Sequence, residues 1–326
     1  MKDHMHLNVG VVGVGHFGRL HALKAAKHAE ERLVGVYDPD FKRAEQVARE
    51  TGCRPYEHYE ALLPDVDAVI IAAPAEAHYA LGCQALKAGR HVLVEKPIAS
   101  TISEGREMAL LAEEHQAVLQ VGHLLRYSAE HKAITERIQS PLYIEATRIA
   151  PFKPRGTDVS VVLDLMIHDL DLVLSIVDSP IHSIDALGAA VSSEHEDIAN
   201  ARVRFENGCV AAITASRISL KTERRMRVFS QDGYLSANFM KCELTYINKK
   251  RGFPLPGTGG YRREAVTWSE IDHLSAEHTA FVASCLRKEA VLVDARAGLR
   301  ALEAALNVTE SIRASQRLME QSGLIR

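Results

Sequence analysis

The stretch LNVGVVGVGHFG, from Leu7 to Gly18, decides the fold of the first half of the chain. Its opening residues are apolar and rich in valine, which is typical of a buried strand. The glycines at 13, 15 and 18 then form a GxGxxG pattern that opens a helical segment at 17–29. Asp38 follows at the end of a second predicted strand. This context indicates a dinucleotide-binding turn, in which the glycines admit a pyrophosphate and the helix N-terminus stabilises its charge.

Strands and helices alternate through the rest of the first half. Apolar runs at 33–38, 67–74, 91–97 and 117–122 predict strands, and helical segments follow Pro39 and lie at 76–87 and 102–115. Alternation of this length predicts βαβ units with a parallel sheet and right-handed crossovers. We therefore expect a Rossmann-like dinucleotide-binding domain at 1–123.

The second half has a different rhythm. From residue 181 onward, short β-like runs follow one another without helices, and Asn207-Gly208 lies where a hairpin turn belongs. Residues 251–263 are rich in glycine and proline and predict a loop, and helices are predicted at 276–287 and 295–314. We expect an α/β protein whose residues 124–326 form an α+β domain for substrate binding and oligomerisation, with a largely antiparallel sheet open on one face.

The composition excludes several classes of protein. The chain has 326 residues, of which 47% are hydrophobic and 25% charged, and its formal net charge is −3. These values are globular and argue against nucleic acid or a membrane surface as a partner. No apolar run is long enough to span a bilayer, and the N-terminus lacks the apolar segment of a signal peptide. The five scattered cysteines favour neither disulfides nor zinc, so we expect a cytoplasmic protein.

Asp38 also predicts which dinucleotide binds. A carboxylate at this position accepts hydrogen bonds from the adenosine ribose hydroxyls and repels a 2′-phosphate, which favours NAD over NADP. Lys42 and Arg43 follow closely and are cations that a 2′-phosphate would attract. We interpret them as solvated helix charges.

The stretch LDLMIHDLDL, residues 163–172, places four polar groups in an otherwise apolar segment. Asp164 and His168 are four residues apart, so on a helix they share one face. We interpret Asp169 and Asp171 as surface charges, although Asp169 is also placed to orient the histidine. A metal site formed by Asp164, His168 and His123 is an alternative, less favoured because no tight ligand spacing accompanies it.

Three motifs together carry a family resemblance. GVGHFG at 13–18, Glu95-Lys96-Pro97 after the fourth long strand, and Asp164-x-x-x-His168 resemble the Gfo/Idh/MocA oxidoreductases along nearly the whole chain. The resemblance implies that Lys96 and His168 flank the substrate carbon beside nicotinamide and that Asp164 lines the same site. The catalytic residues expected are thus Lys96, His168 and Asp164.

The resemblance also implies the cofactor contacts. Pro74 and His78 match the cofactor-side loop of the family, while Ala75 departs from the polar residue often found there. The expected NAD-binding residues are Gly13, Gly15, His16, Phe17, Gly18, Asp38, Pro74, His78, Glu95 and Lys96.

The expected reaction is hydride transfer from a carbinol carbon to NAD. His168 would take the hydroxyl proton, since histidine titrates near neutrality, and the Lys96 cation would stabilise the developing alkoxide. The second half resembles the branch that oxidises C3 of UDP-N-acetylglucosamine ahead of transamination on a lipid A route. A diphosphate needs cations, so we expect substrate contacts from Arg155, Arg217 and Arg225, together with His123. A solvated, charged strand face is the equal alternative for the arginines, which belong to a basic stretch containing Arg217, Lys221, Arg224, Arg225 and Arg227.

Two other functions remain open from the sequence. A free-sugar or inositol dehydrogenase would use the same chemistry on an uncharged ring. A non-catalytic NAD-sensing regulator would have the same fold but no need for Lys96, Asp164 and His168. Because single-faced sheets often pair across a symmetry axis, we expect a homodimer or homotetramer.

Overall fold

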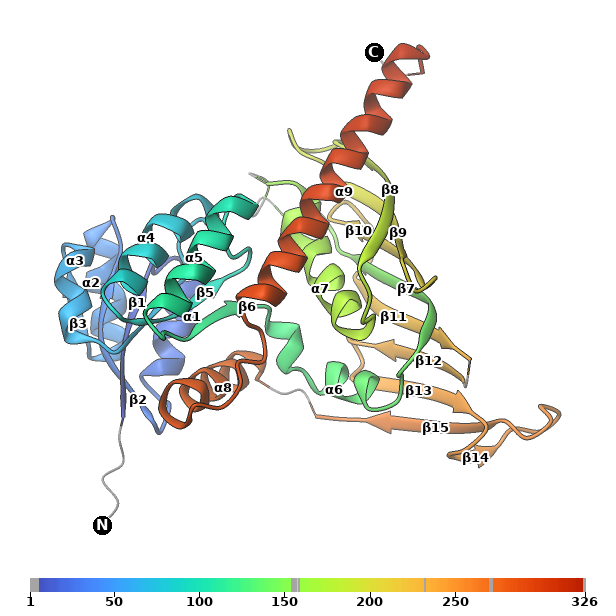
Figure 1. Cartoon of the computed structure of the whole chain (residues 1–326), viewed down its shortest axis with the longest axis horizontal. Coiled ribbons are helices and arrows are strands. Elements are labelled where there is room, and N and C mark those ends of the chain that lie inside the picture. The colour runs from blue at the N-terminus through green and yellow to red at the C-terminus, as the bar shows by residue number, and fades with distance from the viewer. Residues whose placement is uncertain (1–5, 154–156, 158, 232, 270–271, 325–326) are drawn as a thin grey trace. The chain divides into compact units, whose positions relative to one another are not determined.

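The structure is a computed structural model (Figure 1), and it describes residues 6–153, 157, 159–231, 233–269 and 272–324. The chain divides into two compact units. The first comprises Met1–Tyr127 and Asp272–Leu302, and the second comprises Ser128–Ile271 and Glu303–Arg326. The domain boundary predicted at residue 123 therefore needs a correction, because 31 residues from 272 to 302 fold with the N-terminal unit.

The first unit contains a six-stranded sheet of order β3-β2-β1-β4-β5-β6. Every neighbouring pair is parallel, as the strand–helix alternation predicts. The short strand β3 was not predicted. The six strands are β1 (Leu7–Val12), β2 (Glu31–Tyr37), β3 (Arg54–Tyr56), β4 (Ala68–Ile71), β5 (His91–Glu95) and β6 (Leu119–Gly122).

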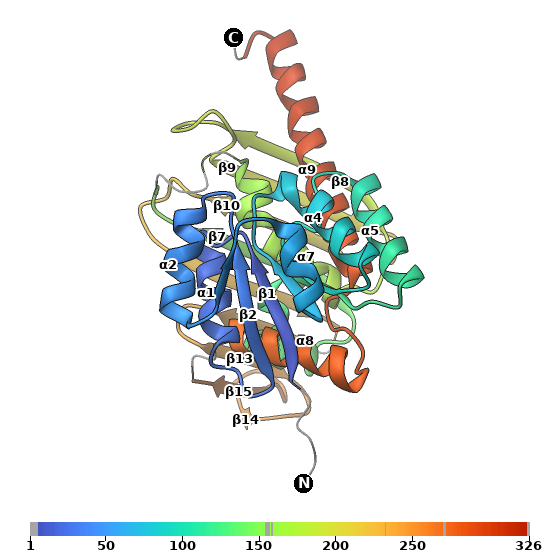
Figure 2. The same ribbon diagram turned by 90° about the vertical axis from the view of Figure 1, so that its left-hand side faces the viewer.

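Helices cover both faces of this sheet (Figure 2). Helices α1 (His16–Ala25) and α2 (Phe41–Thr51) lie on one face and contribute Ala22, Val47 and other residues to a core with β1. On the other face lie α4 (Ala75–Lys87) and α5 (Ile102–Glu114), which pack closely where Gly82 meets Met108. Short helical turns complete the unit: α3 (Tyr59–Leu62), η1 (Leu63–Asp65) and η2 (Leu124–Tyr127).

Helix α8 (His273–Arg287) is the element that corrects the predicted boundary. Its Phe281 and Val282 are fully buried in the core that contains Val9 and Val11 of β1. The apolar stripe of α8 thus completes the face that α1 and α2 leave partly uncovered, so the chain returns to its first unit. At 25 cal/mol per Å² of apolar surface, burial of a phenylalanine side chain contributes roughly 1.5–3 kcal/mol.

The second unit is a nine-stranded sheet of order β14-β15-β13-β12-β11-β7-β10-β9-β8. All neighbours are antiparallel except β7 and β10, which are parallel. Gly208, with a φ of 87°, provides the left-handed residue in the predicted hairpin turn between β9 and β10. The strands are β7 (Pro141–Ile149), β8 (Ile181–Ala189), β9 (Ile198–Phe205), β10 (Val210–Ser216), β11 (Glu223–Ser230), β12 (Gly233–Asn238), β13 (Glu243–Asn248), β14 (Phe253–Pro254) and β15 (Arg262–Thr267).

One face of this sheet is covered by helices and the other is open. Burial alternates along β9, where Ala199, Ala201, Val203 and Phe205 are buried and the residues between them are exposed. Helix α6 (Ala129–Thr135) contacts β12, α7 (Ile167–Ile176) contacts β7 and β10, and Ser311 of α9 (Ala295–Gln321) donates to the carbonyl of Ile184 on β8. The predicted open antiparallel sheet is confirmed.

Two general expectations can be compared with the described residues. No helix among them combines the length and the hydropathy needed to cross a bilayer. All five cysteines are free thiols.

Candidate active site

The three glycines of the fingerprint meet three different requirements. Gly13 has a φ of 79°, and a Cβ there would lie 2.7 Å from the backbone of Ala73. A Cβ at Gly18 would overlap the carbonyl oxygen of Gly13, so this glycine allows the helix to pack on the strand. At Gly15, by contrast, a Cβ would meet no described atom within 4 Å. The turn therefore leaves open space where the backbone can approach a pyrophosphate.

The N-terminus of α1 suits an anion. Gly15 is its N-cap, and no side chain in the described part of the chain caps the first turn. The first turn carries the exposed side chains of His16 and Phe17 and no acidic residue. Uncapped backbone N–H groups and the positive end of the helix dipole stabilise phosphate charge. The residues present thus fit the phosphates of a dinucleotide.

Asp38 lies directly after β2 and is only 3% exposed. Its Oδ2 accepts a hydrogen bond from the backbone N–H of Val14 at 2.9 Å, and its Oδ1 accepts one from Asp40 at 2.9 Å. The guanidinium of Arg43 lies 3.3 Å away. Asp38 therefore ties the fingerprint turn to the end of β2. Its negative charge also offsets the positive charge of Arg43, the cation that a 2′-phosphate would need. The role of Asp38 toward a ribose remains a prediction.

His78 connects two loops at the carboxyl edge of the parallel sheet. Its Nδ1 lies 2.8 Å from the carbonyl oxygen of Pro97, and its Nε2 lies 2.9 Å from that of Ala73. Burial lowers the pKa of His78. Because a neutral imidazole donates only once, one of these two contacts is the hydrogen bond and the other is a close approach. His78 thereby holds the loop that begins at Pro74 against the loop that follows β5.

Lys96 follows the last residue of β5, at the same edge of the sheet as the fingerprint turn. β1, β4 and β5 are adjacent parallel strands, so their carboxyl ends meet at one edge. Open α/β sheets bind ligands at this edge. The backbone N–H of Lys96 donates to Oε2 of Glu95 at 3.2 Å. The first unit thus brings together the fingerprint, the loop at Pro74, and Lys96.

In the second unit, Asp164 and His168 lie on a helix that begins irregularly. Val162–Met166 form a π-helical turn that runs directly into α7. Asp164 lies inside this turn, and its backbone N–H donates to Ser160 at 3.0 Å. Both side chains are partly exposed, whereas most of α7 is buried. Single π-turns inside helices occur frequently at functional sites.

The interpretation of Asp169 and Asp171 as surface charges is wrong, because each is only 2% exposed. Asp169 accepts two hydrogen bonds from Arg148 of β7, at 2.6 and 3.0 Å, in a buried bidentate ion pair. The pair fastens the helix that carries His168 to the sheet. Asp169 therefore positions α7 as a whole by binding Arg148.

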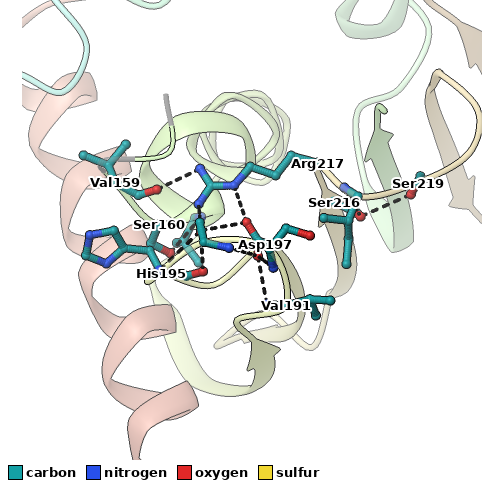
Figure 3. A network of polar contacts seen from close by, with 12 residues as sticks. Val159, Ser160, Val191, His195, Asp197, Ser216, Arg217 and Ser219 are labelled. Atoms are coloured by element: carbon teal, nitrogen blue, oxygen red, sulfur yellow. Dashed lines mark hydrogen bonds and ion pairs between the residues drawn. The ribbon is translucent and has the colours of Figure 1, made fainter. Parts of the chain in front are cut away.

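Arg217, an expected substrate contact, lies inside a buried network (Figure 3). Its guanidinium donates to Asp197 at 2.8 Å, to the carbonyl of Val159 at 2.8 Å and to Ser193 at 3.0 Å. Burial opposes ionisation of Asp197, but Arg217 and the backbone N–H groups of Ser192 and Val191 hold its pKa well below the usual range. With 4% exposure and these partners, Arg217 stabilises the fold of this region and is not retained as a phosphate ligand.

The other expected substrate contacts lie in different environments. Arg155 lies outside the described residues. His123 is buried directly after β6 in the first unit. Arg224 and Arg225 are both exposed. Arg225 shares the open face of the sheet with Arg227, whereas Arg224 shares the helix-covered face and stands opposite Arg148. Alternation along β11 thus directs Arg224 to the α7 side of the sheet.

The second unit also contains a cavity of about 540 Å³ that the sequence did not predict. Its lining combines the segment that leads into the π-turn with a face of α9. The lining residues are Val159, Ser160, Leu163, His195, Glu196, Leu306, Asn307, Thr309, Glu310 and Arg313. The separate parts of this lining are far apart in sequence, so no local pattern could have identified it.

Comparisons with known proteins place these features in a family. The oxidoreductase family model GFO_IDH_MocA, an NAD-binding Rossmann fold, matches residues 7–123, and the GFO/IDH/MocA C-terminal domain matches residues 146–236. The chain is 40% identical over 314 residues to UDP-N-acetylglucosamine 3-dehydrogenase of Acidithiobacillus ferrooxidans, covering 95% of this chain and 98% of the relative. It is 28% identical over 230 residues to scyllo-inositol 2-dehydrogenase (NAD(+)) of Bacillus subtilis, covering 64% and 67%.

Solved structures give the same result. UDP-N-acetylglucosamine 3-dehydrogenase GnnA from Acidithiobacillus ferrooxidans aligns with a TM-score of 0.89 at 40% identity, covering 95% of this chain and 98% of that one. Scyllo-inositol dehydrogenase from Lactobacillus casei, with bound NAD(H) and scyllo-inositol, aligns with a TM-score of 0.79 at 21% identity, covering 95% and 98%, and shows the fold alone. With two family domains matched and a full-length relative at 40% identity, the chain belongs to the Gfo/Idh/MocA oxidoreductases and carries their NAD-binding Rossmann domain.

Proposed function

We propose that this protein is an NAD-dependent dehydrogenase that oxidises the C3 hydroxyl of UDP-N-acetylglucosamine to the 3-keto sugar. The observation that carries the proposal is the 40% identity to a relative of that name, which extends over nearly the full length of both chains. The inositol dehydrogenases match less of the chain at lower identity. The glycine turn, Lys96, Asp164 and His168 are the residues that this chemistry requires.

Bound NAD would supply the acceptor for the hydride that leaves the carbinol carbon. The chain's own residues then have three tasks. His168 takes the hydroxyl proton, because an imidazole is the side chain best suited to accept a proton near neutral pH. Lys96, as a cation, stabilises the oxygen on which negative charge develops. Asp164, one turn before His168, orients the ring hydroxyl or the imidazole.

The product would carry a ketone next to the acetamido carbon, and a ketone is the group that a transaminase converts to an amine. The route would then lead toward a diamino sugar of lipid A. Free thiols at all five described cysteines support a reducing, cytoplasmic setting.

Recognition of the diphosphate can be tested with a matched pair of neighbours on β11. We expect Arg224 to contribute, since it lies on the α7 side of the sheet, and Arg225, on the open face, to serve as its control. Arg224→Ala should raise KM for UDP-N-acetylglucosamine with little change in kcat, and Arg225→Ala should change neither. If instead Arg225→Ala raised KM and Arg224→Ala did not, Arg225 would be the diphosphate ligand, as the sequence predicted.

The substrate is tested directly by NADH production. Purified protein is supplied with NAD and, separately, UDP-N-acetylglucosamine, free N-acetylglucosamine, UDP-glucose and myo-inositol. The proposal expects turnover only with the first, or at least 100-fold higher kcat/KM, about 2.7 kcal/mol of discrimination. Preference for myo-inositol would identify a free-polyol dehydrogenase. NADH binding without turnover on any of them would support a regulator.

We further infer that the protein forms a homodimer or homotetramer through the open face of its nine-stranded sheet. That face carries a contiguous aromatic group, with Tyr143 and Phe229 ring centroids 5.7 Å apart and Phe229 and Tyr234 4.9 Å apart. Light scattering of the purified protein would give its mass. Phe229→Glu should reduce that mass to the monomer value of 35.9 kDa.

A further inference from the structure

A network of buried, hydrogen-bonded polar groups crosses the interior of the first unit and ends beside Lys96. Glu31 of β2 lies 2.9 Å from Nδ1 of His278 on α8. Nε2 of His278 lies 3.0 Å from Nδ1 of His21 on α1, and Nε2 of His21 lies 3.0 Å from Oε1 of Glu95. Glu95 immediately precedes Lys96, so this network links two helices and two strands to the expected catalytic lysine.

The hydrogen bonds of this network require one proton more than two neutral imidazoles supply. Three consecutive contacts need three protons, and each neutral imidazole carries one. The two carboxylates at the ends, Glu31 and Glu95, only accept when ionised. Either one imidazole is therefore doubly protonated, or one end carboxyl is protonated.

The surroundings decide where the third proton lies. Burial lowers the pKa of His278, so His278 is neutral, donates from Nδ1 to Glu31 and accepts at Nε2. Burial opposes ionisation of Glu95, but His21 and Lys96 hold its pKa below the usual range, so Glu95 is an anion. Both oxygens of Glu31 lie 2.9–3.0 Å from Nδ1 of His278, which fits one N–H facing an ionised carboxylate. The third proton then belongs to His21, which as an imidazolium donates to His278 and to Glu95.

Glu277 of α8 closes the cluster from another side. It is 0% exposed, and neither of its carboxyl oxygens has a hydrogen-bond partner among the described residues. One carboxyl oxygen, an oxygen of Glu95 and a ring nitrogen of His21 lie within 4.8 Å of one another. Burial, reinforced by the charge of Glu95, raises the pKa of Glu277 well above its ordinary value. An ionised carboxylate in this position would be a second buried anion without a donor.

We propose that Glu277 is a neutral carboxylic acid and His21 an imidazolium, and that together they position Glu95 as a counter-ion of Lys96. The charges then balance, because Glu31 and Glu95 are offset by His21 and Lys96. Lys24, the other nearby cation acting on His278, is paired with Asp272. His21 and Glu277 are positioning residues that act through Glu95, and their effect on turnover rests on the proposed function.

A divalent metal is the other group that one imidazole and two carboxylates could hold. The contact between Nε2 of His21 and Oε1 of Glu95 favours the proton, because 3.0 Å is a hydrogen-bond distance between an N–H and an oxygen. A metal would instead need the lone pairs of the His21 nitrogen and the Glu95 oxygen to point at the position of the ion and not at each other. Metal analysis of the purified protein therefore belongs in the test.

The protonation states can be measured without any substrate. Infrared spectra near neutral pH should show the carbonyl stretch of a protonated carboxylic acid, and Glu277→Gln should remove it. Glu114→Gln, which changes an exposed carboxylate at the end of α5, should leave it in place. Nitrogen-15 NMR should show both ring nitrogens of His21 protonated. A missing acid band, or one stoichiometric metal ion that Glu277→Gln releases, would overturn the proposal.

The positioning role is measured by activity. Glu277→Gln mimics the neutral acid and should retain kcat and its pH profile. His21→Gln removes the charge beside Glu95, so the alkaline limb of kcat should move by about one pH unit or more while NADH affinity is kept. His28→Gln, on a partly exposed histidine just past the same helix, should change neither. A normal pH profile of kcat in His21→Gln and in Glu95→Gln would refute the positioning role. If the protein turned over none of the sugars, the proposed function would fail, but the infrared and NMR spectra would still test the protonation states.

Discussion

Replacing Asp169 with leucine leaves the guanidinium of Arg148 buried without its anion. Arg148 is 5% exposed and Asp169 is 2% exposed, and two hydrogen bonds join them at 2.6 and 3.0 Å. Removing one member of a buried ion pair costs about 3–5 kcal/mol, because the desolvated charge that remains has no partner. Arg224 stands opposite Arg148 in the strand register, so a second cation lies near the one left unpaired. We therefore expect a loss toward the upper end of that range.

The double variant separates the charge from the packing. Asp169→Leu with Arg148→Met replaces the whole pair by apolar side chains, and such replacements are often neutral or stabilising. We expect the double variant to unfold within about 1 kcal/mol of the natural protein. Asp178→Leu, which changes an exposed acid just after α7, should stay within about 0.5 kcal/mol.

Urea denaturation followed by tryptophan fluorescence is the appropriate assay. The single tryptophan, Trp268, belongs to the second unit, as do both members of the pair. The signal thus reports the unit that is perturbed, which matters because a chain with two compact units need not unfold in one step. If Asp169→Leu cost less than about 1 kcal/mol, or if the double variant were as unstable as the single one, the ion pair would not be what fastens α7.

Three further predictions concern the site. His168→Ala should reduce kcat with UDP-N-acetylglucosamine by about 10²–10⁴-fold while NADH affinity, measured by calorimetry, is kept; near-normal turnover would remove His168 from the mechanism. Gly15→Val should weaken NADH binding without unfolding the protein, since its side chain would enter open space that the pyrophosphate needs; unchanged affinity in the same calorimetric titration would contradict this. Glu277 has a pKa raised on folding, so its contribution to stability is fully present below about pH 4 and falls as pH rises toward the folded pKa, by up to about 1.4 kcal/mol per pH unit. Hydrogen exchange of the β1 amides between pH 5 and 8 should show this slope in the natural protein and a flatter one in Glu277→Gln, and parallel profiles would count against a neutral Glu277.

Local sequence patterns predicted most of the strands and helices that alternate along the first unit. Five of the six parallel strands of the first unit were found because each is a short apolar run between helical segments, and the glycine turn was identified by its position after the first of them. The three-residue strand β3 was missed. Arg262–Thr267 was missed because β15 lies next to a segment rich in glycine and proline, and its alternating charged residues resemble a loop. A strand of that kind is stabilised by its pairing with β13, which the sequence of either strand does not reveal.

The candidate site shows the same division. Lys96, Asp164 and His168 were identified from motifs, but the burial of Asp169 was not, because its partner Arg148 is 21 residues away on another element. Arg217 was assigned to phosphate for the converse reason. A basic residue in a basic stretch indicates an exposed cation, whereas Asp197, 20 residues earlier, places this one in the interior.

The return of α8 to the first unit has a chemical consequence as well as a structural one. Its apolar stripe completes the core beside β1. Glu277 and His278 lie one helical turn before Phe281 and Val282 on the same buried face, so the same packing carries them into the interior. A chain that ended its first domain at residue 123 would leave His21 and Glu95 without those partners. The ionisation of the residue before Lys96 therefore depends on a helix more than 150 residues away in sequence, and truncating the chain before α8 should abolish the imidazolium signal of His21 along with the fold of the first unit.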